Sequence, residues 1–486
     1  MYECPNCGGN LKFDIPSQLL KCDYCETTQD PYHVTKAQDA EENDVFDVTV
    51  FTCPQCGGEI MSTDTSAAEF CSFCGASTIL SSRISRELRP AQIIPFKQTR
   101  EACKKAYIAH MKRSPFAPDE LKDEKHIDSF RGIYMPYWSY DISQEGPVFL
   151  KGKKSYTRGD YTYTDEYDLS GRIDANYNNL SYDASSSFAD SISEQIAPFN
   201  VKDKKEFTPS FLSGFYADTS DVDSDLYKND AIEIANNTSY DNIRKVPAFS
   251  DLKLSCAKNS FAMATAFHTW CDTPRRVMYP VWFMSYRKNN RVAYATVNGQ
   301  TGKVAADIPV DLKKYVLGSV LLALPVFLLL NLFFTIKPKT VLAFAGVLAI
   351  ATFFIYMTEM SRIFHRDKRH DDRGYLYRQA LEQESQKDGR GPARKSDNSI
   401  SLKDLLAFSI TDKNYRMGGA LSALAATAVA ALIWLLNPIS DIWYYTGTIL
   451  SFLGVLFTVM EIIKKYNVLA TRRLPQFDRS GGDDRA

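Results

Sequence analysis

Four apolar stretches dominate the second half of the 486-residue chain, at 315–336, 341–360, 418–437 and 443–463. Each is about 20 residues long, enough to cross a hydrocarbon core of roughly 30 Å at 1.5 Å per residue. The pattern predicts four transmembrane α-helices in two hairpins, 315–360 and 418–463. The third stretch is rich in glycine and alanine, which favours close helix packing within a bundle or between subunits.

Basic residues near the ends of these stretches indicate their orientation. They follow the second and fourth stretches, at Arg362, Arg366, Lys368, Arg369, Arg373, Lys464, Lys465, Arg472 and Arg473. The short loop between the third and fourth stretches has none. Because loops rich in Lys and Arg stay in the cytoplasm, we expect a multi-pass protein of the cell membrane with both termini cytoplasmic.

The spans themselves carry little charge. Their acidic residues are Glu359 and Glu461, both close to the predicted cytoplasmic ends. Buried charge within a bilayer usually marks an ion or substrate pathway. We therefore interpret the spans as an anchor, with a transporter or channel component as the alternative.

Residues 86–312 have the mixed pattern of a cytoplasmic α+β domain. Thr99 and the apolar positions after it predict a helix over 99–113. The segments 134–142 and 279–287 each place a proline before aromatic residues and predict strands, and a further hairpin turns at Asn298–Gly299. Tyrosines alternate with polar residues over 160–169, which predicts a half-buried strand.

Eight of the eleven cysteines form four CxxC pairs, arranged as two copies of C-x2-C-x14-C-x2-C. The repeat extends to "YECPNCGG" and "FTCPQCGG", so one unit has been duplicated. Two residues between cysteines allow both sulfurs to reach one ion, and the following glycines supply the positive φ of such a turn. The predicted ligands are Cys4, Cys7, Cys22 and Cys25 in the first unit and Cys53, Cys56, Cys71 and Cys74 in the second.

Four thiolates around one ion are typical of a structural zinc site. The sequence therefore predicts two small zinc ribbons of the β-hairpin type and two Zn²⁺ per chain. Rubredoxin-like iron sites use the same turns, and a thioredoxin-like dithiol uses a single CxxC on a βαβ frame. The N-terminus shows no export signal, which agrees with metal-binding thiols in a reducing compartment. Cys103, Cys256 and Cys271 are interpreted as buried inert thiols.

The charge of the chain is unevenly distributed although its total is only −1. Residues 1–85 hold four basic and thirteen acidic residues, a net charge of −9, whereas 86–486 carries 53 basic and 45 acidic residues, a net of +8. Two Zn(Cys)4 centres would take the front end to about −13. Because nucleic-acid binding rests on neutralising phosphates, this charge disfavours it and favours a protein partner.

These features together predict eight segments. They are ribbon 1 at 1–34, an acidic linker at 35–50, ribbon 2 at 51–85, the α+β domain at 86–312, the hairpin at 315–360, a basic, disordered loop at 361–417, the hairpin at 418–463 and a tail at 464–486. No P-loop, GxSxG or HExxH motif occurs in the chain, so we do not expect an enzyme.

The tandem CPxCGG units, "YMPYW", "VNGQTGKV" and the membrane hairpins resemble a bacterial family of zinc-ribbon membrane proteins. Members are often encoded beside phage shock protein A homologues and are often labelled primosomal helicase-like. The resemblance covers most of 1–336 and implies recruitment of a cytoplasmic membrane-stress protein to the bilayer. We therefore expect a membrane-anchored adaptor that docks a protein on its acidic front end, for instance through Glu41, Glu42 and Asp44. Assembly into a homo-oligomer stays open. A membrane-tethered nucleic-acid-binding protein is the alternative.

Overall fold

The computed structural model describes residues 2–38, 45–62, 71–76, 81–249, 251–255, 260–288, 291–333, 337–365 and 417–473. Several sequence expectations lie outside these residues. They concern Glu41, Glu42 and Asp44, Cys256, most of the basic loop and the tail after 473.

A 14-stranded sheet forms the centre of the soluble region. Two neighbouring strands near its middle are β8 (Arg131–Arg158) and β14 (Arg275–Lys288), which run antiparallel with Tyr134 opposite Pro280. The two proline-aromatic segments of the sequence therefore lie side by side in the core, which confirms both predicted strands. On its other side β14 pairs with β15 (Arg291–Asn298), and β15 pairs with β16 (Val304–Ala306).

The remaining strands of this sheet are short or join it at its sides. They are β4 (Val45–Thr52), β5 (Glu59–Ser62), β6 (Ser81–Leu88), β7 (Gln92–Ile93), β10 (Lys205–Glu206), β11 (Tyr216–Asp218), β12 (Lys253–Ser255), β13 (Thr269–Cys271) and β17 (Arg472–Arg473), together with β9 (Tyr161–Asp183).

Helices and short 3₁₀ turns cover this sheet. The helix α2 (Arg100–Lys112) begins after Thr99, whose hydroxyl accepts a hydrogen bond from the Ala102 amide at 3.2 Å. This cap confirms the helix predicted over 99–113. The other elements are α3 (Glu124–Ile127), α4 (Asp190–Ile196), α5 (Lys228–Lys245), α6 (Ser260–Ala266), and the 3₁₀ turns at 119–122, 201–203, 209–212 and 247–249.

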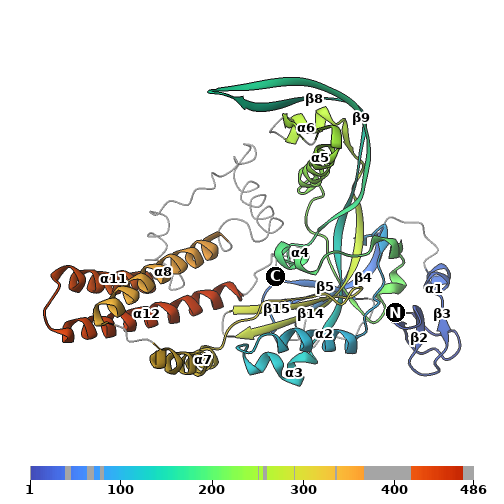
Figure 1. The fold of residues 1–486 in the computed structure, drawn as a ribbon. Coiled ribbons are helices and arrows are strands. Elements are labelled where there is room, and N and C mark those ends of the chain that lie inside the picture. Colours follow the sequence, from blue (N-terminus) through green and yellow to red (C-terminus); the bar gives the residue numbers. More distant parts are fainter. Residues whose placement is uncertain are drawn as a thin grey trace, which may run out of the picture.

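A long β-hairpin, which we call the arm, leaves the sheet where β8 and β9 continue beyond it (Figure 1). Its strands stay paired out to Arg158 and Tyr161 at the tip. The helices α5 and α6 cover only its base, and every residue of 161–168 is exposed. The strand predicted at 160–169 is confirmed by β9, but the expectation that it is half-buried was wrong, because this part of the hairpin has no second layer to pack against.

The two cysteine units are built differently. In the first, β1 (Leu11–Asp14), β2 (Leu19–Cys22) and β3 (Thr28–Gln29) form a separate three-stranded sheet, followed by α1 (Pro31–Gln38). In the second, β4, β5 and β6 belong to the large sheet, where β5 pairs with β11. The second unit is therefore a part of the central sheet rather than an isolated hairpin.

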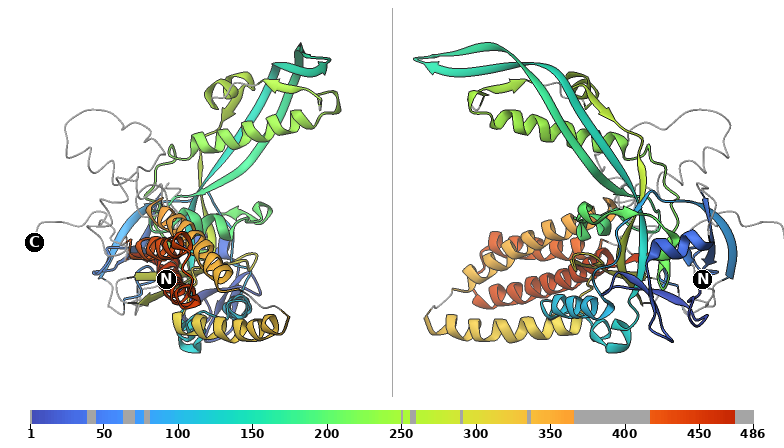
Figure 2. Two further views of the ribbon diagram at one scale, coloured as in Figure 1. Left: turned by 60° about the vertical axis from the view of Figure 1, so that its left-hand side comes forward. Right: turned by 90° about the vertical axis from the view of Figure 1, so that its right-hand side faces the viewer.

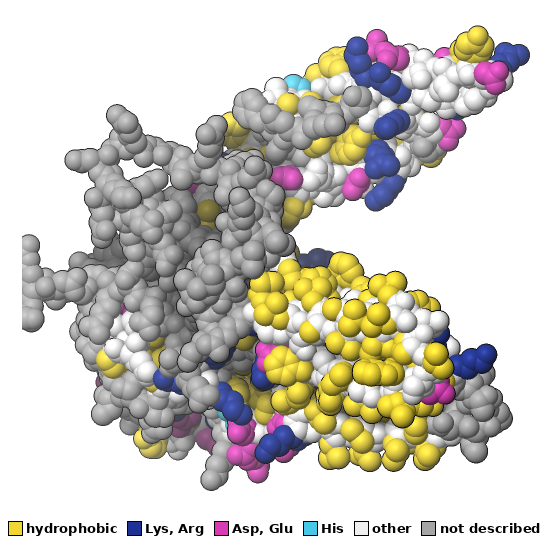
Figure 3. All heavy atoms as spheres, turned by 90° about the vertical axis from the view of Figure 1, so that its left-hand side faces the viewer, with side chains coloured by type: hydrophobic (Ala, Val, Ile, Leu, Met, Phe, Trp, Pro, Cys, Tyr) yellow, Lys and Arg dark blue, Asp and Glu magenta, His cyan; other side chains and the backbone are white. Residues whose placement is uncertain are grey.

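Four helices are long and apolar enough to cross a membrane: α7 (Leu312–Phe333), α8 (Pro338–His365), α11 (Gly418–Leu436) and α12 (Asp441–Leu469). The last three pack into a bundle, and hydrophobic side chains cover the face of it seen in Figure 3. Small residues allow close contact, since a Cβ at Gly454 would lie 2.8 Å from Ala426 Cβ. The expectation that the third span packs closely within a bundle is confirmed.

The first of the four, α7, lies apart from this bundle (Figures 1 and 2). Its first turn contacts the soluble core, where Tyr315 packs edge-on against Phe116 and Lys314 donates a 3.1 Å hydrogen bond to the Ala117 carbonyl. The two spans predicted as the first hairpin are consecutive helices, and the extensive contacts of α8 are with α11 and α12. Helices in membranes associate through small residues, and the one glycine of α7, Gly318, already faces the Phe116 ring.

The end of α12 is attached directly to the central sheet. After α12 the chain forms β17, which pairs with β15. Arg291 of β15 donates hydrogen bonds to the carbonyls of Val468 and Thr471 at 2.7 and 2.6 Å, and the Asn467 side chain bonds both the amide and the carbonyl of Val310. The start of α7 and the end of α12 thus both contact the same soluble core.

Candidate metal centres

The first cysteine cluster lies between two turns of the three-stranded unit. Cys4 and Cys7 precede β1, and Cys22 and Cys25 stand at the end of β2 and just after it. Both turns have the same backbone bonds: the Gly8 amide donates to the Cys4 carbonyl at 2.8 Å, and the Glu26 amide donates to the Cys22 carbonyl at 3.0 Å. Cys4 and Cys22 are buried, Cys25 is half-buried and Cys7 is exposed.

The second cluster repeats this geometry inside the core. The Gly57 amide donates to the Cys53 carbonyl at 2.8 Å, and the Gly75 amide donates to the Cys71 carbonyl at 3.0 Å. All four cysteines are at most 2% exposed. They pack in one cluster with Phe73 of their own turn and with side chains of β14 and β15. This centre is therefore shielded from solvent on every side.

Both clusters fit a tetrahedral metal ion. In each, all four Sγ atoms lie within 4.8 Å of one another. Tetrahedral Zn–S bonds of about 2.3 Å require sulfurs about 3.8 Å apart. The Cys53–Cys74 and Cys56–Cys71 Sγ pairs are 3.8 and 3.7 Å apart, and the Cys4–Cys25 and Cys7–Cys22 pairs are 3.5 and 3.4 Å apart. Each predicted quartet is therefore brought together and can hold one metal ion.

The electrostatics of the buried cluster also favour a cation. Hydrogen bonding to Cys53, then to Cys56 and Cys74, together with burial, raises the pKa of Cys71 far above its usual range. The four thiols cannot all ionise in such a place without a compensating positive charge. A divalent ion supplies that charge and replaces the protons.

The exposed cluster has a hydrogen-bond partner that the cysteine spacing did not reveal. The Thr27 hydroxyl lies 3.1 Å from Cys25 Sγ. This side chain, followed by the Thr27 backbone and Cys7, lowers the pKa of Cys25 to about 5. Cys25 is therefore ready to bind a metal at neutral pH. A polar residue two positions after a CxxC pair was the available sequence signal.

Two further hydroxyls belong to the surroundings of the second centre. Ser72 lies between Cys71 and Cys74, and a Cβ added at Gly75 would lie 3.3 Å from Ser285 Oγ of β14. Both hydroxyl oxygens are buried without a hydrogen-bond partner within the described part of the chain. A buried hydroxyl without a hydrogen-bond partner costs free energy. Negatively charged thiolates beside the two hydroxyls would reduce this cost. Ser285 is 214 positions from Cys71, so no local pattern could have identified it.

Within the described ranges, no third group of His, Cys, Asp or Glu residues has this geometry. Of the scattered cysteines, Cys103 is fully buried on the inner face of α2, where burial raises the pKa of its thiol. Cys271 is half-buried at the end of β13. The interpretation as a buried thiol therefore holds for Cys103 and only in part for Cys271.

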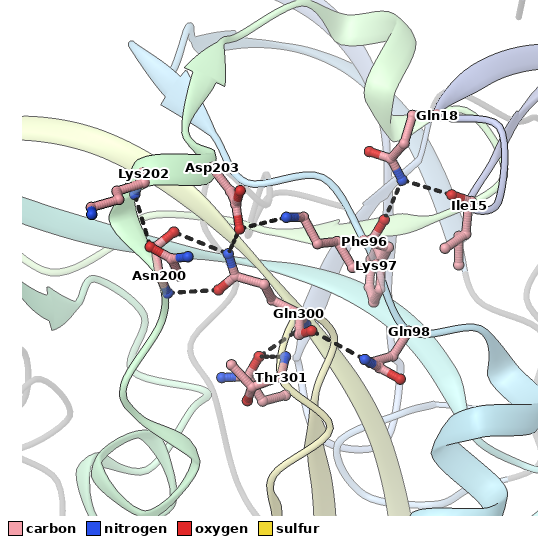
Figure 4. A network of polar contacts seen from close by, with 11 residues as sticks. Ile15, Gln18, Phe96, Lys97, Gln98, Asn200, Lys202, Asp203, Gln300 and Thr301 are labelled. Carbon is pink, nitrogen blue, oxygen red and sulfur yellow. Dashed lines mark hydrogen bonds and ion pairs between the residues drawn. The ribbon is translucent and has the colours of Figure 1, made fainter.

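The first centre is fixed to the core by contacts that involve the VNGQTGKV motif (Figure 4). Gln18, in the turn between β1 and β2, donates to the Phe96 carbonyl at 2.8 Å. Gln98, two residues after Phe96, donates a hydrogen bond to the Gln300 carbonyl at 3.2 Å. The Gln300 side chain forms hydrogen bonds with Asn200 and Asp203. Asn298 shapes the loop by accepting from the Gln300 and Thr301 amides. The hairpin predicted at Asn298–Gly299 is confirmed, since β15 and β16 pair antiparallel across this turn, and the turn also connects to Gln98, Asn200 and Asp203.

Comparison with known proteins gives one informative similarity. No protein-family model matches the chain, and no solved structure matches it. It is similar to a protein of Bacillus subtilis (strain 168) described as "Uncharacterized protein YdjG", with 27% identity over 319 residues, which cover 64% of this chain and 90% of that protein. The description of this relative names no activity, metal or partner.

Proposed function

We propose that the chain is a membrane-anchored zinc-ribbon adaptor that holds a cytoplasmic protein at the membrane, without catalysing a reaction. The observation that carries this proposal is the contrast between the two metal centres. The first stands at the surface with exposed acidic residues, while the second is enclosed in a sheet that is joined to the membrane helices through β17. One centre is thus free to dock a partner and the other is not.

The surface of the first unit supports docking of a protein rather than of nucleic acid. Two of its lysines are already paired within the unit, Lys12 with Asp23 at 2.7 Å and Lys21 with Glu26 at 3.9 Å. A zinc ion held by four thiolates adds a formal charge of about −2. The first unit therefore has few cations available to neutralise the phosphates of a nucleic acid. A protein with a basic face is complementary to this acidic surface.

The resemblance to zinc-ribbon proteins encoded beside phage shock protein A homologues supplies a candidate partner of that kind. In this proposal the acidic surface of the first unit contacts such a protein, and the four spans keep the complex at the cell membrane during envelope stress. A metal-pinned unit is rigid without a large core, so little ordering entropy is lost on binding.

The test uses the full-length chain, because the second unit shares its sheet with later residues. Glu3, Asp23 and Glu26 are exposed on the first unit. Their combined replacement by Lys should release a protein that co-purifies with gently solubilised membranes, while two metal ions per chain remain. Glu233, Asp241 and Asp251, exposed near the base of the arm, give a control with the same change in charge.

The outcomes separate the alternatives. Release by the first set and not by the control supports docking on the first unit. Retention of the partner by both variants contradicts it. Nuclease-sensitive DNA or RNA held at physiological salt by the unaltered protein would favour the nucleic-acid alternative.

A further inference from the structure

The outer part of the arm carries four tyrosines on one face, which we call the tyrosine face: Tyr156, Tyr161, Tyr163 and Tyr167. Residues directly opposite each other in a hairpin share a face, and Tyr156 lies opposite Tyr163 while Arg158 lies opposite Tyr161. The rings are between 41% and 72% exposed. Tyr156 and Tyr163 stack with ring centroids 5.7 Å apart. Lys154 and Asp165 lie opposite each other on the same face, between Tyr163 and Tyr167. The face is therefore amphipathic, with four aromatic rings and a pair of charged side chains.

Nearer the core the same face is buried. Val148 and Leu150, on the same side of β8 as Tyr156, pack against Phe267, and Met263 of α6 and Ile243 of α5 pack around this cluster. Leu150 is 8% exposed, whereas Tyr156, six residues further out, is 46% exposed. The apolar face thus extends beyond the helices that cover its base. An apolar face that stays exposed beyond the helices covering its base is a candidate contact surface.

The position of the arm indicates what it contacts. The right-hand view of Figure 2 and the space-filling view of Figure 3 show the arm and the bundle of α8, α11 and α12 leaving the core towards the same side. The bilayer surface nearest the core is marked by ion pairs at the core ends of two of these helices, Arg362–Glu359 at 2.8 Å and Lys464–Glu461 at 2.7 Å. In both views the arm extends past these core ends, so its outer part reaches the level of the bilayer.

We propose that the tyrosine face lies in the headgroup region of the bilayer that the bundle crosses, as a second membrane contact beside the helices. Tyrosine suits this position because its ring is apolar and its hydroxyl is polar, and aromatic residues gather at membrane–water interfaces for that reason. This contact is independent of the partner protein that the first metal unit docks.

The charges of the arm indicate whether its contact with the bilayer depends on anionic lipids. Its basic residues on β8, Lys151, Lys153, Lys154 and Arg158, are balanced by Asp160 in the tip turn and by Asp165, Glu166 and Asp168 on β9. Lys153 and Glu166 form an ion pair directly across the strands. A balanced surface is attracted only weakly to anionic headgroups. The contact therefore depends on the rings, and it forms equally well on zwitterionic and anionic bilayers.

Photo-crosslinking in the full-length protein tests this proposal. The photoreactive residue p-benzoylphenylalanine replaces Tyr161 at the tip, in protein reconstituted into vesicles of radiolabelled phosphatidylcholine, with or without phosphatidylglycerol. Two controls carry the same residue elsewhere. One replaces Thr162, exposed on the opposite face of the arm, and the other replaces Tyr24, 80% exposed on the first metal unit at the other end of the core.

We expect a radiolabelled lipid adduct at position 161 in both kinds of vesicle, a weaker one at 162, and none above background at 24. Metal content of two ions per chain confirms that each variant is folded. The proposal is overturned by equal lipid labelling at 161 and 24, by no lipid labelling at 161, or by an adduct at 161 to a second copy of the chain or to another protein.

Discussion

The two metal centres have the same cysteine spacing and the same turn hydrogen bonds, yet they occupy opposite environments. The first is held by a three-stranded sheet of its own and leaves Cys7 at the surface. The second is flanked by β4 and β6, which place it inside the 14-stranded sheet with all four cysteines buried. The cysteine spacing therefore specifies the metal-binding turns. The strands that flank each cysteine quartet determine whether it lies at the protein surface or inside the core.

The largest difference between the centres should appear when a ligand of the second is removed. A structural zinc ion contributes about 10–16 kcal/mol, comparable with the entire stability of about 5–15 kcal/mol of a typical domain. We expect Cys71→Ser to prevent the central sheet from folding, measured as loss of the second metal ion and protease sensitivity of β5 and β11. Cys103→Ala, which changes a buried cysteine outside both centres, should keep two ions. A protease-resistant sheet in Cys71→Ser would contradict this account.

Removal of a ligand from the first centre should have a local effect. We expect Cys22→Ser to leave one metal ion per chain and to increase amide exchange within 2–38, while β4, β5 and β14 stay protected. The reason is that the first unit has its own sheet and meets the core mainly through side chains, such as Phe13 against Phe211 at 5.3 Å. Loss of protection in β5 would show that the two centres fold as one unit.

The hydrogen bond from Thr27 should make the pH response of the first centre distinctive. The folded pKa of Cys25 is lowered from 9.0 to about 5. Its thiolate is therefore retained until the pH falls through about 5, and its contribution to metal binding is lost below that value. Thr27→Val should raise this pKa, so that a chelator removes the metal at a higher pH. Partners of metal ligands typically change affinity by about 10–100-fold.

The control for this experiment is Thr28→Val, which alters a neighbouring exposed threonine. Metal release from it should follow the pH profile of the unaltered protein. A shift of the same size in both variants would mean that the Thr27 hydroxyl has no specific role.

The smallest expected difference concerns the residue that follows each second CxxC pair. Glu26 and Gly75 occupy equivalent positions, with φ of 58° and 67°. Glu26→Gly should stabilise the first unit by about 1 kcal/mol, because it removes the strain of a positive φ. The loss of the exposed 3.9 Å ion pair with Lys21 offsets little of this gain. Chelator-induced unfolding of the first unit measures the change.

At the second centre the matched change should have the opposite sign. A Cβ at Gly75 would lie 3.3 Å from both Ser285 Oγ and Arg287 Cβ. Gly75→Ala therefore adds crowding to the strain of a positive φ and should destabilise the core. Equal effects of the two substitutions would show that the environments differ less than their burial indicates.

Local signals in the sequence predicted the elements that depend on neighbouring residues. Thr99 capped its helix as expected, the cysteine spacing identified both quartets, and apolar length located the four candidate spans. Pairings between distant segments were not predictable. The strand β5 meets β11 more than 150 residues later, and nothing around Ser62 indicates Tyr216 as its neighbour. The tyrosine alternation at 160–169 correctly indicated a strand but not its burial, because tyrosine suits both a half-buried sheet and an exposed amphipathic face.

The attachment of α12 to the central sheet has a mechanical consequence. Arg291 holds the carbonyls of Val468 and Thr471, and Arg472 pairs with Val292 in the strand ladder. Tyr294, two residues further along β15, lies in the same buried cluster as Cys56 and Cys71. A force that displaces α12 along its axis must break these hydrogen bonds or pull on β15. Tension or thinning of the bilayer would thus be transmitted along one strand to the enclosed metal centre.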